Sequence, residues 1–277
     1  CFFSSSDGGQ SWNKKLIPET TTQDWCTFYD FYVHTANPDT VFLYGYSRKD
    51  GLYYYILYRS FDGGDTWSSI SSNDWGRLDA VCYSEDTGKL YVNEDPWIFT
   101  SSDCGDTWQQ STGQVWNSFS IAVDPANSSI VYAASIGEVY RSSDGGNTWS
   151  SYSSGLYVDL HCCAFLIDRA NSSRLFYTNY AGVFCSTNSG ETWQDSNSGL
   201  HAANINSVEA APSDPNTLYI SFKDNAVYKT SNAMSKAAAA AAVSWERIPP
   251  FFGCHSIVDF EIDPSSPSTV FALEEGG

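Results

Sequence analysis

Short apolar runs separated by turn-forming residues recur along the whole chain. Residues 57–59, 139–141 and 183–185 are examples, and they are rich in the β-branched and aromatic residues that favour strands. Each of these runs leads into a segment of the form Ser-x-Asp/Asn-x-Gly-x-Thr-Trp. Asp bonds its own backbone and Gly accepts positive φ, so the middle of the segment predicts a tight turn. The pattern therefore predicts a strand, a turn and a second strand that begins at Thr-Trp.

Six copies of this segment occur, and the sixth is a damaged copy between residues 230 and 245. Successive copies are 55, 41, 41, 44 and 44 residues apart. A period of this size indicates a repeat architecture. The acidic or amide position and the closing tryptophan of the six copies are Asp7 and Trp12, Asp62 and Trp67, Asp103 and Trp108, Asp144 and Trp149, Asn188 and Trp193, and Asn232 and Trp245.

A second pattern lies upstream of the repeated segment. Residues 121–132, 166–177 and 260–271 each contain two apolar runs joined by a turn of Asp, Pro, Asn or Ser, which predicts two further strands. The repeat is thus four short antiparallel strands in about 40 residues, which is the size of one β-propeller blade.

On these motifs the chain resembles the Asp-box (BNR-repeat) β-propellers. This class includes sialidases, xyloglucan-cleaving glycosidases, sortilin-type receptor domains and a photosystem assembly factor. The resemblance covers nearly the whole chain, and it implies an all-β fold in which the repeated segment is structural and lies at the outer turn between the third and fourth strands. It does not decide the function, because the class contains both enzymes and binding proteins.

The six segments predict six blades, of which the first lacks its beginning and the last lacks its end. Residues 270–277 followed by 1–12 match residues 131–149 in register. We therefore expect residues 1–277 to form a single six-bladed domain whose first blade is completed by the N- and C-terminal segments, which removes open sheet edges. Two alternatives remain open. The chain is an excerpt of a longer protein, or the open half-blades pair with a neighbouring molecule and this self-assembly propagates into a fibre.

Composition narrows the classes of partner. The net charge of −18 excludes nucleic acid, whose binding needs a basic surface. No run of 18 apolar residues occurs, so we expect no membrane span. Eight cysteines without a Cys-x-x-Cys metal pattern suggest disulfides in an oxidising compartment, with free buried thiols as the alternative. They are Cys1, Cys26, Cys82, Cys104, Cys162, Cys163, Cys185 and Cys254.

Two Asn-x-Ser sequons begin at Asn127 and Asn171, 44 residues apart and in the same predicted turn of successive repeats. Together with the cysteines they favour a secreted glycoprotein, although Asn and Ser are also common turn residues. Cys1 is then the start of a mature or truncated chain. The six alanines at 237–242 interrupt the sixth segment, either as an insertion loop or as placeholders for other side chains.

The sequence contains no recognisable set of catalytic residues. A sialidase needs three arginines around one carboxylate, and the seven arginines of this chain leave too few for a central triad. A xyloglucanase-type glycosidase needs two carboxylates facing each other across a cleft, and the class forms that cleft between two propellers. Asp30, Asp79 and Asp159 are loose candidates without a partner at a recognisable spacing. We therefore predict no catalytic residue, no metal ligand and no cofactor.

Aromatic residues in the predicted loops between blades are the better candidates for a site. In propellers these loops surround the axis, where aromatic side chains stack on sugars or anchor a protein, or else plug the central hole. The favoured hypothesis is a non-enzymatic extracellular glycoprotein that acts as an interaction or structural module and binds a protein or a glycan. The alternative is a glycan-binding or glycan-cleaving propeller related to xyloglucanase-type glycosidases. The loop candidates are Trp25, Trp75, Trp116, Tyr157, His201, Phe251 and Phe252.

Overall fold

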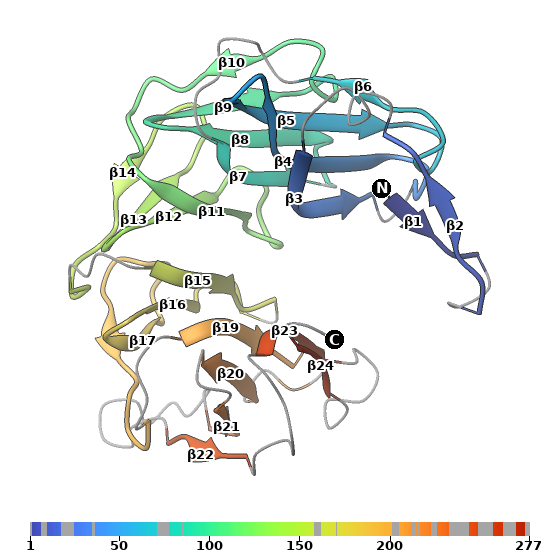
Figure 1. Ribbon diagram of the computed structural model, residues 1–277. Helices are drawn as coiled ribbons and strands as arrows, with labels where there is room; N and C mark the ends of the chain where they lie inside the picture. Colours follow the sequence, from blue (N-terminus) through green and yellow to red (C-terminus); the bar gives the residue numbers. More distant parts are fainter. Residues whose placement is uncertain are drawn as a thin grey trace. The chain divides into compact units, whose positions relative to one another are not determined.

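The computed structural model of the chain describes residues 2–6, 10–17, 25–34, 37–70, 78–84, 86–157, 162–169, 171–200, 205–211, 214, 217–222, 226–232, 244–248, 257–262 and 270–274. The regular structure of these residues consists of β-strands, named β1 to β24 (Figure 1). The prediction of an all-β chain is therefore confirmed. The alanines at 237–242 lie outside the described residues.

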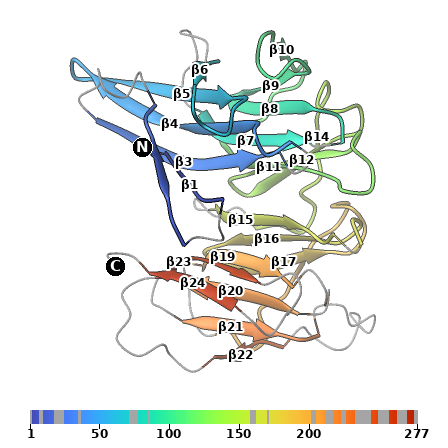
Figure 2. The same cartoon turned by 90° about the vertical axis from the view of Figure 1, so that its right-hand side faces the viewer.

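Five sheets have four strands each, and the strands of each sheet are hydrogen-bonded in chain order. Neighbouring strands pair antiparallel, as β4 does with β5 and β16 with β17. Figure 2 shows β20, β21 and β22 side by side in this order. The repeat of four short antiparallel strands predicted from the sequence is confirmed by these sheets.

The first of these sheets contains β3 (Trp25–Val33), β4 (Val41–Lys49), β5 (Leu52–Ser60) and β6 (Ser68–Ser69). The second contains β7 (Leu78–Ser84), β8 (Lys89–Glu94), β9 (Trp97–Ser101) and β10 (Gln109–Gln110). The third contains β11 (Ser118–Val123), β12 (Val131–Ser135), β13 (Glu138–Ser142) and β14 (Ser150–Ser151). The fourth contains β15 (Cys162–Ile167), β16 (Leu175–Asn179), β17 (Gly182–Ser186) and β18 (Gln194–Asp195). The fifth contains β19 (Ile205–Ala210), β20 (Leu218–Phe222), β21 (Val227–Thr230) and β22 (Glu246–Arg247).

Two further sheets have two strands each. One pairs β1 (Phe2–Ser4) with β2 (Asn13–Lys15), and the other pairs β23 (Ile257–Ile262) with β24 (Val270–Glu274). These are the two half-blades expected from the ends of the chain. Their union into one blade, and with it the count of six blades, stays a prediction.

The chain divides into two compact units. Unit 1 comprises Cys1–Ile121 and Gly146–Thr148, and unit 2 comprises Ala122–Gly145 and Trp149–Gly277. Sheets β3–β6 and β7–β10 belong to unit 1, whereas sheets β15–β18 and β19–β22 belong to unit 2. The prediction that residues 1–277 form a single domain stays a prediction.

The core of each unit lies between successive sheets. In unit 1, Phe42 and Leu57 of sheet β3–β6 pack against Leu78, Leu90 and Val92 of sheet β7–β10. These side chains alternate with polar or opposite-facing positions, as the two-residue period of a strand requires.

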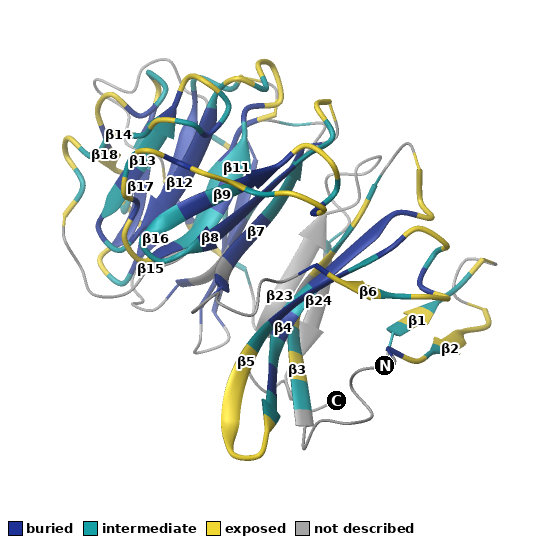
Figure 3. Ribbon diagram, turned by 90° about the horizontal axis from the view of Figure 1, so that it is seen from above, coloured by how far each residue is buried: buried dark blue, intermediate teal, exposed yellow. Residues whose placement is uncertain are grey.

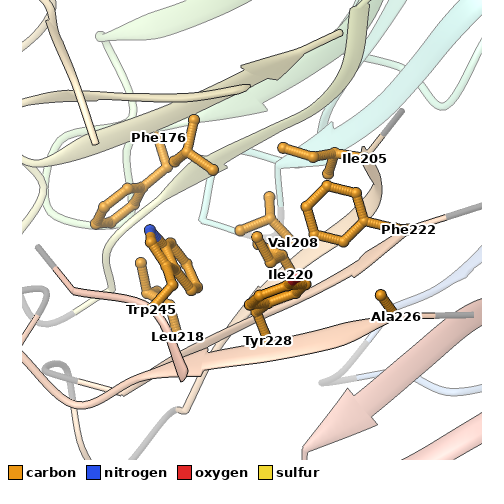
Figure 4. Close-up of a cluster of buried hydrophobic side chains, with 10 residues drawn as sticks. Phe176, Ile205, Val208, Leu218, Ile220, Phe222, Ala226, Tyr228 and Trp245 are labelled. Carbon is orange, nitrogen blue, oxygen red and sulfur yellow. The ribbon is translucent and has the colours of Figure 1, made fainter. Parts of the chain in front are cut away.

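In unit 2, the same type of core joins sheet β15–β18 to sheet β19–β22. Phe176 of β16 packs with Leu218 and Ile220 of β20, and Trp245 closes the cluster beside Phe176 and Leu218 (Figure 4). Burying such side chains contributes about 1.5–3 kcal/mol each to the free energy of folding.

The first strand of several sheets carries a β-bulge at the same place. The extra residue shifts the register and re-aims the neighbouring side chains. The shifts fall between Phe28 and Asp30, Leu78 and Ala80, Cys162 and Ala164, Ile205 and Ser207, and Ile257 and Asp259.

Opposite the first of these bulges lies Gly45 of β4. A Cβ atom on Gly45 would lie 2.1 Å from the carbonyl oxygen of Thr27 and 2.7 Å from the Cα of Phe28. The bulge in β3 therefore depends on a residue without a side chain in β4.

The sheet β1–β2 is held against the turn that follows β5. Phe2 contacts Trp67 edge-on with 5.4 Å between ring centres, and Lys15 Nζ donates to the carbonyl oxygen of Gly63 at 2.9 Å. A Cβ atom on Gly64 would lie 2.7 Å from the Phe2 ring, as one on Gly105 would lie 2.5 Å from Ile70 of the preceding repeat. Sheet β1–β2 thus packs against the turn at Gly64 as the preceding repeat packs against the turn at Gly105.

Candidate functional site

The repeated segment folds into one turn, which we call the repeat turn and define by residues 60–67 and their equivalents. Ser60 Oγ donates to Asp62 Oδ1 at 2.8 Å and accepts from the Gly64 amide at 2.8 Å. The Thr66 amide and hydroxyl donate to Asp62 Oδ1 and Oδ2 at 2.7 and 2.6 Å. The predicted tight turn is therefore formed by a serine and a carboxylate that bind the backbone.

These hydrogen bonds stabilise the charged carboxylate. Those from the Thr66 side chain, the Thr66 amide and Ser60 lower the pKa of Asp62 from 3.8 to about 2. Hydrogen bonds from Ser101 and Thr107 likewise lower the pKa of Asp103. A carboxylate with a lowered pKa that is engaged with its own turn is a poor general acid, which agrees with the structural role expected for these residues. Asp7 lies outside the described residues.

Asparagine forms the same turn with one hydrogen bond reversed. Asn188 Oδ1 accepts from the Thr192 amide at 3.0 Å, and Asn188 Nδ2 donates to Thr192 Oγ1 at 2.9 Å. In the sixth copy Asn232 Oδ1 accepts from the Ser244 amide at 3.1 Å, twelve positions along the chain. The damaged segment therefore still closes the turn, although its insertion is outside the described part of the chain.

The tryptophans that end the later repeat turns link successive sheets. Trp193 and Trp245 are buried, and their indole N–H groups donate to the carbonyl oxygens of Tyr152 and Ser196 at 2.7 and 2.6 Å. Trp67, Trp108 and Trp149 are half-buried, and Trp12 is exposed. Burial and hydrogen bonding at Trp193 and Trp245 support a packing role for these side chains.

Two of the predicted loop aromatics are described with their side chains. Trp116 and Tyr157 are both exposed, and Tyr157 meets Phe184 edge-on with 5.7 Å between ring centres. Trp116 belongs to unit 1 and Tyr157 to unit 2, and a site shared by the loop aromatics stays a prediction. Trp25 lies in β3 without a described side chain, and Trp75, His201, Phe251 and Phe252 lie outside the described residues.

A row of tyrosines extends along sheet β3–β6 of unit 1 and is exposed at Tyr29 and Tyr53. We define this tyrosine row as Tyr29 of β3, Tyr44 and Tyr46 of β4, and Tyr53 and Tyr55 of β5. The sequence reasoning missed it, although the first repeat step of 55 residues exceeds the others by more than ten. The additional residues lengthen β3, β4 and β5 to nine residues each.

The rings of the row follow one another on one face of the sheet. Tyr29 lies 5.8 Å from Tyr44 and 5.4 Å from Tyr46, and Tyr46 lies 6.0 Å from Tyr53 and 6.3 Å from Tyr55, measured between ring centres. Tyr46 is paired directly with Tyr55 across the strands, which places both side chains on the same face. The bulge in β3 adds Tyr29 to this face.

The row extends from the core into solvent. Tyr44 and Tyr55 border the hydrophobic core of unit 1, whereas Tyr29 is 51% and Tyr53 60% exposed. Figure 3 shows the β4–β5 hairpin changing from buried to exposed along its length. The row therefore has a fixed inner end and an accessible outer end, which suits a binding platform.

The outer end of the row also carries positive charge. The guanidinium carbon of Arg48 lies 5.9 Å from the centre of the Tyr53 ring, and Arg48 is paired directly with Tyr53 in the sheet. Lys49 follows at the end of β4 and is exposed. Tyr54, 46% exposed, lies on the opposite face of the same hairpin because side chains alternate along a strand.

The two sequons adopt the same exposed turn in unit 2. Asn127 Oδ1 accepts from the Ser129 amide at 3.1 Å, and Asn171 Oδ1 accepts from the Ser173 amide at 3.2 Å. The predicted equivalence of the two turns is confirmed. Attachment of sugar to either asparagine stays a prediction.

The cysteines give no support to the disulfide prediction in the described part of the chain. Cys26, Cys104 and Cys185 are free thiols there, and burial raises the pKa of Cys185 to about 11. Cys1 and Cys254 lie outside the described residues, and the side chains of Cys162 and Cys163 are not described.

The described residues show neither a metal cluster nor a membrane-spanning helix. They contain no group of three or more His, Cys, Asp or Glu side chains placed to hold a metal ion. In the same residues no helix reaches the length and apolar character needed to cross a membrane. Of the loose carboxylate candidates, Asp30 and Asp79 lie in strands without described side chains, and Asp159 lies outside the described residues.

The sequence matches no protein-family model and no curated protein. Solved structures are nevertheless similar. An ancestral GH74 enzyme superposes with a TM-score of 0.75 at 16% identity, covering 98% of this chain and 40% of that one. The GH74 xyloglucanase from Xanthomonas campestris gives 0.72 at 14% identity, covering 99% and 48%. This chain therefore spans less than half the length of both GH74 enzymes.

A third similar structure is close to this chain in length. YCF48 from Cyanidioschyzon merolae gives a TM-score of 0.58 at 14% identity, covering 90% of this chain and 93% of that one. All three are β-propeller proteins, and at such low identity the likeness concerns the fold alone. With its five four-stranded sheets in chain order, this chain has the fold of a β-propeller.

Proposed function

We propose that this protein is a carbohydrate-binding β-propeller and that the tyrosine row is its binding platform. The observation that carries the proposal is the row itself: five tyrosine rings on one face of sheet β3–β6, in which contacting rings lie 5.4 to 6.3 Å apart between centres and Tyr46 contacts three of the others. Pyranose rings have faces of C–H bonds that stack on aromatic rings, while phenol hydroxyls bond the sugar hydroxyls. A ladder of such rings fits a chain of sugars better than a single small ligand.

The likeness to known structures supports a glycan ligand over the favoured sequence hypothesis. The two GH74 structures are named as enzymes, one of them a xyloglucanase, and both share the fold of this chain over nearly its whole length. The glycan-binding or glycan-cleaving alternative is therefore better supported than a purely structural or fibre-forming module. We propose binding as the function because the described residues offer an aromatic platform for a sugar chain.

Several finer features belong to the same proposal. We infer an Asp-box propeller of six blades in one domain, closed by sheets β1–β2 and β23–β24, because β1–β2 already occupies the place of a preceding sheet. We infer an extracellular glycoprotein with sugar at Asn127 and Asn171, because both sequons present an exposed asparagine in the same turn. Mass spectrometry before and after enzymatic deglycosylation of the secreted chain tests the second inference.

Affinity electrophoresis and calorimetry against a panel of soluble polysaccharides, xyloglucan included, test the proposed function. We expect at least one polysaccharide to bind and the variant Tyr29→Ala/Tyr46→Ala/Tyr53→Ala to lose that binding. The matched control is Tyr54→Ala, which removes an exposed tyrosine from the opposite face of the same hairpin.

Four outcomes bear on the choice between functions. An equal loss of polysaccharide binding in the triple variant and in Tyr54→Ala would contradict the proposal that the tyrosine row is the binding platform. Failure of the unaltered protein to bind any polysaccharide would contradict it as well. Capture of a protein partner by the row, without any glycan binding, would favour the interaction-module hypothesis. Release of reducing sugar from a bound polysaccharide would show cleavage in addition to binding.

A further inference from the structure

Arg48 stands apart from the other partly buried arginines of the described residues. Arg59 donates to the carbonyl oxygen of Cys104 at 2.8 Å and forms an ion pair with Asp106. Arg174 forms an ion pair with Asp168 at 3.5 Å, and Arg141 donates to Tyr152 Oη at 3.2 Å. The Nε atoms of all four arginines are buried without a hydrogen-bond partner, but the Arg48 guanidinium alone among them makes no side-chain hydrogen bond or ion pair within the described part of the chain.

This lack of a partner is unexpected in so acidic a chain. The sequence has 32 acidic residues against 14 lysines and arginines, so carboxylates are plentiful. A partly buried guanidinium normally obtains a carboxylate or carbonyl partner, because an unmade hydrogen bond to a charged donor is unfavourable. The Arg48 guanidinium carbon lies 5.9 Å from the centre of the Tyr53 ring, a platform residue that is 60% exposed.

We propose that Arg48 binds the carboxylate of a uronic acid residue in an acidic polysaccharide whose sugar rings stack on the tyrosine row. This inference rests on the proposed function and names the class of its ligand. The planar guanidinium fork matches a carboxylate with two parallel hydrogen bonds, and its place over Tyr53 puts it beside a stacked sugar. Lys49, the next residue of β4, adds a second exposed cation at the same end.

The positive charge of Arg48 can attract a uronate carboxylate although the net charge of the chain is −18, because electrostatic attraction acts over a short range. At physiological ionic strength charges are screened beyond about 8 Å, so a bound carboxylate responds mainly to the charges at this hairpin end. These are Arg48 and Lys49, with the exposed Asp50 offsetting one of the two positive charges. A neutral glucan would use the rings and leave the guanidinium without a partner. A uronate uses both features.

The test compares two oligosaccharides with the same backbone: a β-linked glucan oligomer and the same oligomer oxidised to glucuronate at its primary alcohols. Calorimetry on the full chain should show about tenfold tighter binding of the glucuronate form, an advantage that shrinks as salt is added. Arg48→Gln should bring the two affinities together, and Arg48→Lys should retain part of the preference. Arg247→Gln, which removes an exposed arginine of β22, is the matched control and should keep the full preference.

Each alternative outcome has a distinct meaning. Equal affinity of the unaltered protein for both oligomers, or an undiminished preference in Arg48→Gln with normal thermal unfolding, would overturn the uronate assignment alone. Tighter binding of a sulfated glucan than of the glucuronate form would also overturn it. Failure of both oligomers and of every polysaccharide in the panel would overturn the proposed function as well.

Discussion

Sheets β3–β6 and β15–β18 follow one plan and differ most clearly in the length of their strands. In both, the strands pair in chain order, the first strand carries a bulge, and the third leads into a repeat turn. The first three strands have nine residues each in β3–β6, but six, five and five in β15–β18. The shorter sheet stops where its core ends, whereas the longer one continues into solvent.

The difference in strand length separates the residues that pack in the core from those that are available for binding. All five residues of β16 are buried, whereas β5 is buried near the repeat turn and exposed at its hairpin end. The fold therefore needs only the inner part of each strand. At the outer ends of β4 and β5, Arg48 and Tyr53 lie outside the buried core, which is typical of function placed on a scaffold.

The largest expected effect on stability is in the core of sheet β15–β18, the sheet with the shorter strands. Phe176→Ala should lower the free energy of unfolding by about 3–5 kcal/mol, because it opens a cavity in a cluster that two sheets share. Chemical denaturation measures this loss. A change below about 1 kcal/mol would mean that the sheets are not packed as described.

The second effect tests the bulge that adds Tyr29 to the row. Gly45→Ala should lower the free energy of unfolding by about 1–3 kcal/mol, because the new Cβ would meet the backbone of Thr27 and Phe28. It should also weaken glycan binding by moving Tyr29. Gly51→Ala is the control in the same hairpin, since no atom lies within 4 Å of a Cβ there and only its φ of 81° adds strain. Equal destabilisation by the two variants would contradict the close approach at Gly45.

The third effect separates the aspartate turns from the asparagine turns. The folded-state pKa of Asp62, about 2, lies below the ordinary value of 3.8, so its stabilising contribution is complete above about pH 4 and is lost as the pH falls toward 2. The Asn188 turn has no carboxylate and makes no such contribution. The stability of the protein should therefore fall between about pH 4 and pH 2.

Changing Asp62, Asp103 and Asp144 together to asparagine should flatten this acid-induced loss. Asn188 already forms the same turn, so the triple variant should remain folded at neutral pH. Denaturant titrations at several pH values measure both results. An unchanged acid dependence in the triple variant would show that other carboxylates are responsible.

The smallest expected effect on stability is at the outer end of the tyrosine row. Tyr53→Ala should change the free energy of unfolding by no more than about 0.5 kcal/mol, because the side chain is mostly exposed. The same variant should weaken glycan binding clearly. Thermal unfolding and calorimetry on one preparation make the comparison, and a large loss of stability would show that Tyr53 belongs to the core.

The cysteines and the loop aromatics show what the spacing of residues along the chain does not specify. An even number of cysteines suggests pairing, but Cys26, Cys104 and Cys185 are each placed by the strand or turn that contains them, and they remain thiols. Of the loop aromatics, only Trp116 and Tyr157 have described side chains, so a site shared by these residues stays a prediction. The spacing of residues along a chain shows which positions of the repeats are equivalent, but it does not specify how far apart their side chains lie.

The repeat turns and the strand order could be determined from the sequence by itself, because they depend on contacts only a few residues apart. Ser60, Asp62 and Thr66 bond one another within a single turn, so their spacing is enough to predict it. The tyrosine row was decided by the tertiary structure. Alternation puts Tyr53 and Tyr55 on one face, but only the limit of the neighbouring sheet exposes Tyr53, and only the bulge opposite Gly45 adds Tyr29. Exposure and register across strands arise from packing between distant segments, which a local pattern does not specify.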